Sequence, residues 1–450
     1  MMKTGTKRTI AGAAGAALMI VYPLAMFSCG RTQHFELSRF LGPDMCGGCH
    51  AAVADQWKNS MHNLSHFDPV YTAVAKHLRK GLTDPDEIAE AESCVKCHTP
   101  VGFVTGNPTK VSDDLDRVPD IAKQGIQCDY CHSATGARKM YNNDIRLDPG
   151  HGMDNAGTKR GPFTDSHSEF HKSAYSKFHT ESGICGTCHD VRHVVYGTKL
   201  ETTYEEWLGS PYNSSDSNKR IPCQGCHMYQ RPGVPATGST PRPQNPGEAA
   251  GGGPQRAHIY THYFVGANAY VPNKFGDAVK ARMAEERLKN AAALTIIDAE
   301  LSKGIVKVEV KNIGAGHKLP TGLTDVRQMW LEVVVTDAAG RELFSSGKLG
   351  RDGTIPAGAV VYNTVFGDGK GKAVANLAKA REVLKDYRIP PLGSVVETYT
   401  VPNLKAKTVT VIVALKYRSA PQELLDAVFG AGKIVLPVTT MAEAKKQIAL

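Results

Sequence analysis

One five-residue motif, Cys-x-x-Cys-His, occurs five times in this 450-residue chain and constrains its fold more than any other feature. Ten of the 11 cysteines lie in these motifs, and the remaining one is Cys29. The cysteine pairs are Cys46 and Cys49, Cys94 and Cys97, Cys128 and Cys131, Cys185 and Cys188, and Cys223 and Cys226. The histidines that close the motifs are His50, His98, His132, His189 and His227. Such regular pairs exclude a disulfide scaffold, in which cysteine spacing is irregular.

The motif predicts covalently attached haem. Two residues between the thiols space them to reach both vinyl groups of one porphyrin, and the adjoining histidine can bind the iron. A zinc ribbon pairs Cys-x-x-Cys units without needing a histidine after each, and a thioredoxin-like redox site needs only one unit. Neither explains five following histidines. We therefore expect five haem c groups, with the ten cysteines as attachment points and the five histidines as proximal ligands.

The spacing of the motifs predicts the kind of domain that holds them. Their first cysteines lie 48, 34, 57 and 38 residues apart, so there is no internal repeat of fixed period. Few long apolar runs occur between residues 41 and 231. We expect an α-rich, loop-rich multihaem domain over residues 30–231, in which the haems themselves form most of the core.

Twelve further histidines could supply the second axial ligands. They are His34, His62, His66, His77, His151, His167, His171, His179, His193, His258, His262 and His317. Methionine is the other possible ligand, but none of the 12 methionines stands in a recurrent relation to a motif. Ligation by two histidines is therefore favoured, which implies low reduction potentials.

The stretch Trp57-x-x-Ser60-x-His62 after the first motif resembles multihaem cytochromes c. The likeness is to the tetrahaem cytochrome that takes electrons from hydroxylamine oxidoreductase and to outer-surface cytochromes of metal-respiring bacteria. It implies that His62 ligates a neighbouring haem rather than its own. The segment before the fourth motif, residues 161–190, resembles the same family and implies that His171 and His179 are ligands.

Two further ligands are predicted beyond the last motif. The stretch His258-Ile-Tyr-Thr-His262 resembles a family segment that returns a histidine to the haem stack, and His262 is preferred to His258. His317 lies in a loop, residues 312–322, whose glycines permit a tight and exposed backbone. We expect this loop to present His317 as a distal ligand.

The N-terminus predicts export. Lys3, Lys7 and Arg8 precede an uncharged apolar run over residues 10–27, as in a secretory signal. Ser28-Cys29 then resembles a bacterial lipobox, so residues 1–29 are expected to end at an acylated Cys29. Cleavage elsewhere and an uncleaved anchor are the alternatives. The expected location is the periplasm or the outer membrane.

The formal charge of +9 does not predict a nucleic-acid partner. Three of these charges belong to the expected signal, and removing them leaves +6. Ten haem propionates would add acidic groups that a count of residues omits. We therefore expect no nucleic-acid partner.

The rest of the chain divides into three parts. Residues 232–256 are rich in Pro and Gly and predict a linker or surface excursion. Residues 257–293 are expected to carry a ligand and an exposed helix over 275–293. Residues 294–450 change to apolar alternation with a period of two and predict a C-terminal antiparallel β-sandwich.

The predicted strands and turn can be placed in the sequence. Strands are expected at residues 295–301, 304–311, 329–336, 341–344, 395–401 and 408–417. A hairpin turn is expected at residues 338–340, and a helix at residues 422–429. Some multihaem cytochromes end in such a domain, so the resemblance extends to this part of the chain.

These features favour an electron carrier that relays electrons between a quinol-side donor and a terminal acceptor. Its partners would be redox proteins, such as other cytochromes and a quinol-oxidising complex, and its lipid would hold it to the membrane. A carrier has no catalytic residues.

The alternative is a multihaem oxidoreductase with one open iron, acting on nitrite or hydroxylamine, with Tyr130, Arg192 and His193 as candidate residues. Against it, every motif ends in histidine, whereas the pentahaem nitrite reductases resembled in haem count use a lysine at the catalytic haem. A third possibility is a subunit of a cytochrome filament.

Overall fold

A computed structural model of the chain describes residues 1–2, 33–300, 303–402 and 406–449. The expected signal and Cys29 lie outside the described residues, apart from the first two. The chain divides into the units Met1–Thr32 and Gln33–Leu450, and the second contains all the elements described below. In the described part, no helix is both long enough and apolar enough to cross a membrane.

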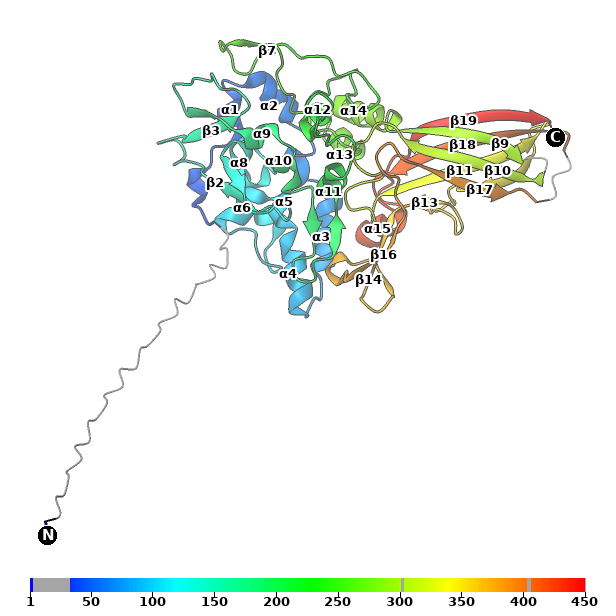
Figure 1. The fold of residues 1–450 in the computed structure, drawn as a ribbon, viewed down its shortest axis with the longest axis horizontal. Helices are drawn as coiled ribbons and strands as arrows, with labels where there is room; N and C mark the ends of the chain where they lie inside the picture. Colours follow the sequence, from blue (N-terminus) through cyan, green and yellow to red (C-terminus); the bar gives the residue numbers. More distant parts are fainter. Residues whose placement is uncertain (3–32, 301–302, 403–405, 450) are drawn as a thin grey trace. The chain divides into compact units, whose positions relative to one another are not determined.

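Residues 33–291, the helical region, consist of short helices joined by loops (Figure 1). The longer helices are α2 (Ala51–Trp57), α3 (Pro69–Arg79), α4 (Pro85–Ser93), α6 (Pro100–Thr105), α11 (Thr203–Leu208), α13 (Tyr270–Lys274) and α14 (Ala278–Lys289). The single-turn helices are α7 (Asp120–Lys123) and α9 (Lys177–Thr180), with 3-10 turns η1 (Leu37–Arg39), η2 (Asn63–Ser65) and η3 (Leu115–Arg117). These short elements agree with the predicted α-rich, loop-rich character of this region.

Each Cys-x-x-Cys-His motif forms or adjoins one turn of helix. These turns are α1 (Pro43–Gly47), α5 (Val95–His98), α8 (Cys128–His132), α10 (Gly183–Gly186) and α12 (Cys223–His227). Residues three apart on a helix share a face, so the turn places both thiols side by side. The His50 amide donates to the Cys46 carbonyl oxygen at 2.9 Å, and the His189 amide donates likewise to Cys185 at 2.9 Å. This bond continues the turn to the histidine.

Small strand pairs connect the helices. They are β1 (Ala134–Ala137) with β2 (Ile145–Leu147), β3 (Thr158–Gly161) with β4 (Lys172–Tyr175), β5 (Val191–Arg192) with β6 (Lys199–Glu201), and β7 (Gly247–Glu248) with β8 (Gln255–Arg256). Only β3 and β4 are parallel among these pairs. The parallel pair follows the third motif and leads into α9.

The Pro- and Gly-rich segment 232–256 is packed against the rest of the protein. Ala236 and Thr237 are buried, and the Gly238 amide donates to the Gly314 carbonyl oxygen at 2.8 Å. The expected helix over 275–293 is present as α14, but the prediction that it is exposed is wrong for one face, on which Met283 and Leu288 are buried. The exposed face of α14 carries Arg282 and Lys289, whereas Lys280 is buried with the apolar residues.

Residues 292–449, the sheet region, carry the strands β9 (Ala292–Glu300), β10 (Ile305–Asn312), β11 (Gln328–Asp337), β12 (Glu342–Ser346), β13 (Val361–Tyr362), β14 (Thr364–Gly367), β15 (Ala373–Val374), β16 (Glu382–Asp386), β17 (Ser394–Thr400), β18 (Thr408–Arg418) and β19 (Thr439–Ala449) (Figure 1). The strand orders are β17-β10-β9, β12-β11-β18-β19 with β13 on β11, and β15-β14-β16. All of these pairings are antiparallel. The expected order of a helical part followed by antiparallel sheets is therefore confirmed.

The first two sheets contribute side chains to one core. Alternate residues of β10, such as Val306 and Val308, are buried together with Leu331 of β11 and Leu415 of β18. This is the period-two burial that the sequence predicted. The predicted helix at 422–429 is present as α15 (Gln422–Phe429), and the hairpin turn falls between β11 and β12, where Gly340 has a φ of +80°.

A buried ion pair joins the two regions. Glu206 in α11 and Arg388, just after β16, have side chains that are 3% and 6% exposed and approach to 2.5 Å. Glu206 also accepts from the Lys318 amide at 3.0 Å and from the Thr321 hydroxyl at 2.8 Å. These bonds fix the loop that carries His317 against α11.

Candidate haem sites

All five motif histidines are held by their Nδ1 atoms. Four of these atoms donate to backbone carbonyl oxygens: His50 to Ala249 at 2.7 Å, His98 to Ser65 at 3.0 Å, His132 to Arg160 at 2.6 Å and His227 to Val265 at 3.3 Å. His189 instead lies 3.3 Å from a carboxylate oxygen of Glu201. An imidazole whose Nδ1 is bound to an acceptor presents Nε2 to a metal. The residues therefore fit proximal ligation, with the Nε2 of His227 lying 3.3 Å from Arg287 Nη2.

Three motif histidines face a second imidazole at nearly equal spacing. The ring centres are 6.4 Å apart for His50 and His171, and 6.3 Å apart for His62 and His189. His132 and His262 are also 6.3 Å apart, and the ring planes of the three pairs differ by 17° to 27°. A metal lies about 2 Å from each imidazole nitrogen, so two imidazoles that share one ion have ring centres about 6 Å apart. These pairs have the spacing of two axial ligands.

His132 has two imidazole neighbours. His179 lies closer than His262, with ring centres 5.6 Å apart. However, His179 Nε2 donates to the Cys131 carbonyl oxygen at 2.9 Å, whereas His262 uses Nδ1 to donate to Tyr260 at 2.9 Å. The Nε2 of His262 is thus available to a metal, and that of His179 is used by the backbone.

The fifth motif lies near His317. Burial and the nearby Arg287 charge lower the pKa of His227 well below its usual value, and His317 adds to the effect. The His317 Nδ1 donates to the Lys318 carbonyl oxygen at 2.9 Å, which orients the ring. The predicted loop histidine therefore lies beside the last motif. His317 is partly buried.

The second motif has a different neighbour. The Tyr71 ring stacks on the His98 imidazole with centres 3.7 Å apart and planes 5° apart. The Tyr71 hydroxyl is buried and has no hydrogen-bond partner among the described residues. Tyr71 projects from α3, which follows the segment that carries His62.

Burial keeps several of these imidazoles neutral. It lowers the pKa of His62 and of His262 to about 3, and that of His98 to about 4. A metal ligand must be deprotonated, so these side chains can bind a metal at neutral pH. His189 differs because, although burial lowers its pKa, the Glu201 carboxylate raises it to about 9.

His62 is positioned by a loop that follows η3 and α7. Its carbonyl oxygen accepts from the Ile126 amide at 3.0 Å, and Trp57 Nε1 donates to the Ile126 carbonyl oxygen at 2.8 Å. A Cβ at Gly125, where φ is +64°, would lie 2.3 Å from the His62 carbonyl oxygen. Trp57 and Gly125 thus hold the turn that directs His62 away from its own motif.

Thiols of different motifs lie next to one another. The Cys46 side chain contacts Cys128, Cys97 contacts Cys188, and Cys185 contacts Cys223. Burial, together with the nearby charge of Cys188, raises the pKa of Cys131 to about 12. The third and fourth motifs therefore also lie close together. The motifs are therefore adjacent in the order first, third and fourth, with the second and fifth both beside the fourth.

The residues considered for an enzyme are used in the structure for packing. The Tyr130 hydroxyl bonds Asn143 at 3.0 Å, Arg192 lies over the Tyr141 ring at 4.4 Å, and His193 Nε2 donates to the Ala378 carbonyl oxygen at 3.0 Å. None of these contacts directs the side chain toward a motif histidine.

Comparisons with known proteins bear on the first three motifs and on the fold. Residues 45–133, which hold the first three motifs, match the family described as cytochrome c554 and c-prime. The fold is similar to the crystal structure of a penta-heme cytochrome c552 from Thermochromatium tepidum, with a TM-score of 0.63 and 18% sequence identity. That match covers 92% of this chain and 100% of the other. No curated protein matches the sequence. The chain has a multihaem cytochrome c fold.

Several residues of these sites were not predicted from the sequence. Glu201 and Tyr71 contact motif histidines, and Arg287 of α14 approaches His227 Nε2 to 3.3 Å. The Pro- and Gly-rich segment supplies the carbonyl of Ala249 to His50. Only Tyr71 had a weak signal, since Tyr71, Ala75 and Arg79 recur at the spacing of one helix face.

Proposed function

We propose that the protein is an exported pentahaem c-type cytochrome that relays electrons between protein partners. The observation that carries this proposal is the set of three imidazole pairs with ring centres 6.3 to 6.4 Å apart, each containing one motif histidine. Haem c, when bound, supplies one-electron transfer. An iron closed by histidine on both faces can exchange electrons but offers no position to a substrate.

The proposed ligand pairs are His50 with His171, His132 with His262, His189 with His62, and His227 with His317. The ring spacings given above support the first three pairs. The effect of His317 on the pKa of His227 supports the fourth pair. His179 is assigned a supporting role, because its Nε2 bonds the Cys131 carbonyl oxygen. This revises the expectation that His179 is itself a ligand.

The neighbouring thiols suggest the order in which electrons pass. Motif one adjoins motif three, three adjoins four, and four adjoins both two and five. A relay built on this order would have three ends, at the first, second and fifth motifs. Redox partners, such as other cytochromes or a quinol-oxidising complex, would dock at these ends.

Intact mass and ferric spin state test the proposal together. The mature protein should exceed its apo mass by five haem units, and a smaller number would contradict the pentahaem assignment. Replacing His317 with alanine should convert one haem from low spin to high spin in the ferric electron paramagnetic resonance spectrum and raise one reduction potential. An unchanged low-spin spectrum in the folded variant would show that His317 is not a ligand.

A second candidate function rests on the second motif. Tyr71, rather than an imidazole, stacks on His98, and its buried hydroxyl has no partner in the described part of the chain. One haem with an open position beside a tyrosine would permit an oxidoreductase acting on a small nitrogen compound. A high-spin component in the ferric wild-type protein that responds to Tyr71→Phe would favour this function, and wholly low-spin haem would exclude it.

The proposed location is the periplasm or the outer membrane, with a lipid attached to Cys29. The support is the sequence of the N-terminus alone. Replacing Cys29 with alanine should release the protein from the membrane fraction. Retention of the variant in that fraction would contradict lipid attachment.

A further inference from the structure

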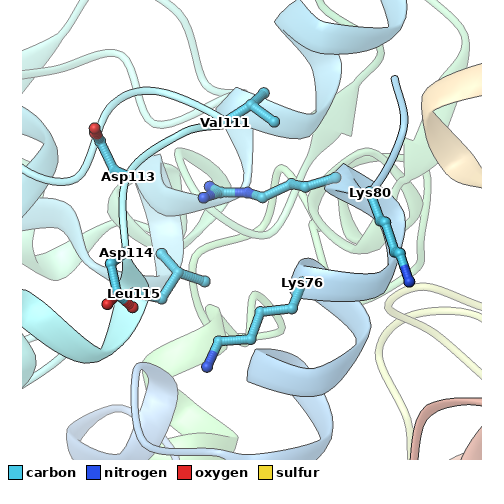
Figure 2. Close-up of a pocket in the computed structure, with 7 residues that line it drawn as sticks. Lys76, Lys80, Val111, Asp113, Asp114 and Leu115 are labelled. Carbon is cyan, nitrogen blue, oxygen red and sulfur yellow. The ribbon is translucent and has the colours of Figure 1, made fainter. Parts of the chain in front are cut away.

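A cleft beside the second motif contains a buried arginine, Arg79, that forms no ion pair with a described carboxylate, although its charge helps to lower the pKa of Asp113. The cleft has a volume of about 260 Å³ and lies between the C-terminal end of α3 and the segment of residues 111–115. Figure 2 shows Lys76 and Lys80 on one wall and Asp113 and Asp114 on the other. Arg79 also lines this cleft and is only 7% exposed.

The guanidinium of Arg79 is incompletely bonded. Its Nη1 donates weakly to the Lys110 carbonyl oxygen at 3.4 Å, while Nε and Nη2 are buried and have no partner among the described residues. Arginine stays protonated in proteins, so the positive charge of Arg79 cannot be removed by loss of a proton. A buried charge is costly unless it is paired, so the geometry calls for an anion.

The aspartates nearby do not supply that anion. Asp113 Oδ2 accepts from the amides of Thr109 and Lys110 at 2.6 and 2.7 Å. Asp114 caps η3 through the Asp116 amide at 2.9 Å and lies 3.3 Å from Arg117.

Asp116 bonds Lys76 at 2.5 Å. Each of the three carboxylates thus has its own partners, and in the described part of the chain none of them pairs with Arg79.

The cleft adjoins the second haem site. Tyr71 and Arg79 project from the same helix, α3, and Tyr71 stacks on His98. Burial raises the pKa of the Cys94 thiol to about 11, while the nearby Arg79 charge acts in the opposite sense. Arg79 is therefore close to the cysteine that would carry this haem.

We propose that this cleft binds one carboxylate or small oxyanion, with Arg79 as the residue that holds it. A planar guanidinium matches two oxygens of such a group, and Lys80 adds positive charge at the mouth. The ligand has two possible sources, a propionate of the haem at Cys94 and Cys97, or a free oxyanion. The first source rests on the proposed function, whereas the second does not require it.

The test uses the mature holoprotein and three variants, Arg79→Gln, Lys80→Glu and Arg341→Gln. Arg341 is the matched control because it is an arginine of the sheet region with an 81% exposed side chain. Inorganic sulfate is titrated at low ionic strength by calorimetry, and the haem potentials are measured by spectroelectrochemistry. The haem number is determined first by intact mass on the same samples.

A free oxyanion predicts that the wild type binds one sulfate. Arg79→Gln should then weaken binding at least tenfold, and Lys80→Glu should weaken it too, while Arg341→Gln leaves it unchanged. A haem propionate predicts no sulfate binding but a lower potential of one haem in Arg79→Gln and in Lys80→Glu, because a positive charge stabilises the reduced haem.

The inference is overturned if the wild type binds no sulfate and both cleft variants keep all potentials of the wild type. Lys80 is exposed, so Lys80→Glu should fold and tests the inference if Arg79→Gln does not fold. A haem number below five would instead contradict the proposed function, and the sulfate titration would still report on the cleft.

Discussion

In the sheet region, buried side chains of two antiparallel sheets form one continuous core that includes Val310, Leu331 and Val413. The helical region divides its buried apolar side chains among small separate clusters, such as the one around Val95 and the one around Tyr130. The sheet region can bury its apolar side chains within its own core, without a bound group. The second region has little continuous apolar packing, so we infer that its stability depends on groups bound by its histidines and cysteines.

The largest expected effect comes from withholding haem. In cells without haem attachment, the helical region should lose its ordered structure, while β11 and β18 should keep slow amide hydrogen exchange because their core needs no cofactor. Hydrogen exchange with mass spectrometry on the exported apoprotein measures both regions at once. Equal protection of the two regions would contradict this comparison.

The next effect concerns the ion pair between the regions. Replacing Arg388 with methionine leaves the Glu206 carboxylate buried without its cation and should lower the free energy of unfolding by about 3–5 kcal/mol. Denaturant unfolding followed by circular dichroism measures the change. Arg341→Met, which removes an arginine that is 81% exposed, should cost less than about 1 kcal/mol. Equal losses in both variants would show that burial of the pair is unimportant.

A cavity in the sheet core should have a somewhat smaller effect. Leu415 is fully buried, and Leu415→Ala should cost about 2–4 kcal/mol without changing the haem spectrum. Val396→Ala, at an exposed position of β17, is the control and should cost little. A change in the haem spectrum of folded Leu415→Ala would show that the two regions are coupled more tightly than we infer.

The smallest effect concerns one ligand within the helical region. His189 alone bonds a carboxylate, and a negative charge beside a ligand stabilises ferric iron. Glu201→Gln should therefore raise one reduction potential by roughly 60 mV, which is a tenfold change for a one-electron couple. Spectroelectrochemistry checks this, with the exposed Glu443→Gln as control. A fall in that potential would contradict the role of Glu201.

The attachment motifs could be located from the sequence because their chemistry requires contiguous residues. The pairing of His62 with His189 could not be worked out from spacing, since it depends on how distant segments fold together. Glu201 gave no local sign of its role, and Tyr71 gave only the weak signal of a helix face. Most long strands were predicted from their alternation, but β19 was missed because small and charged residues alternate along it, as in Ala442 to Lys445.

The imidazole pairs also bear on how the chain reaches its fold. His50 and His171 are 121 residues apart, His62 and His189 are 127 apart, and His132 and His262 are 130 apart. Contacts of such sequence separation form slowly, because the chain must close a long loop before the contact stabilises it. Under the proposed ligation, the irons of the first and third motifs would be held from one side only during export, because His171 and His262 follow their motifs in the chain. The iron of the fourth motif would differ, since His62 precedes its motif. Two metal centres would therefore stay chemically open until the later segments arrive.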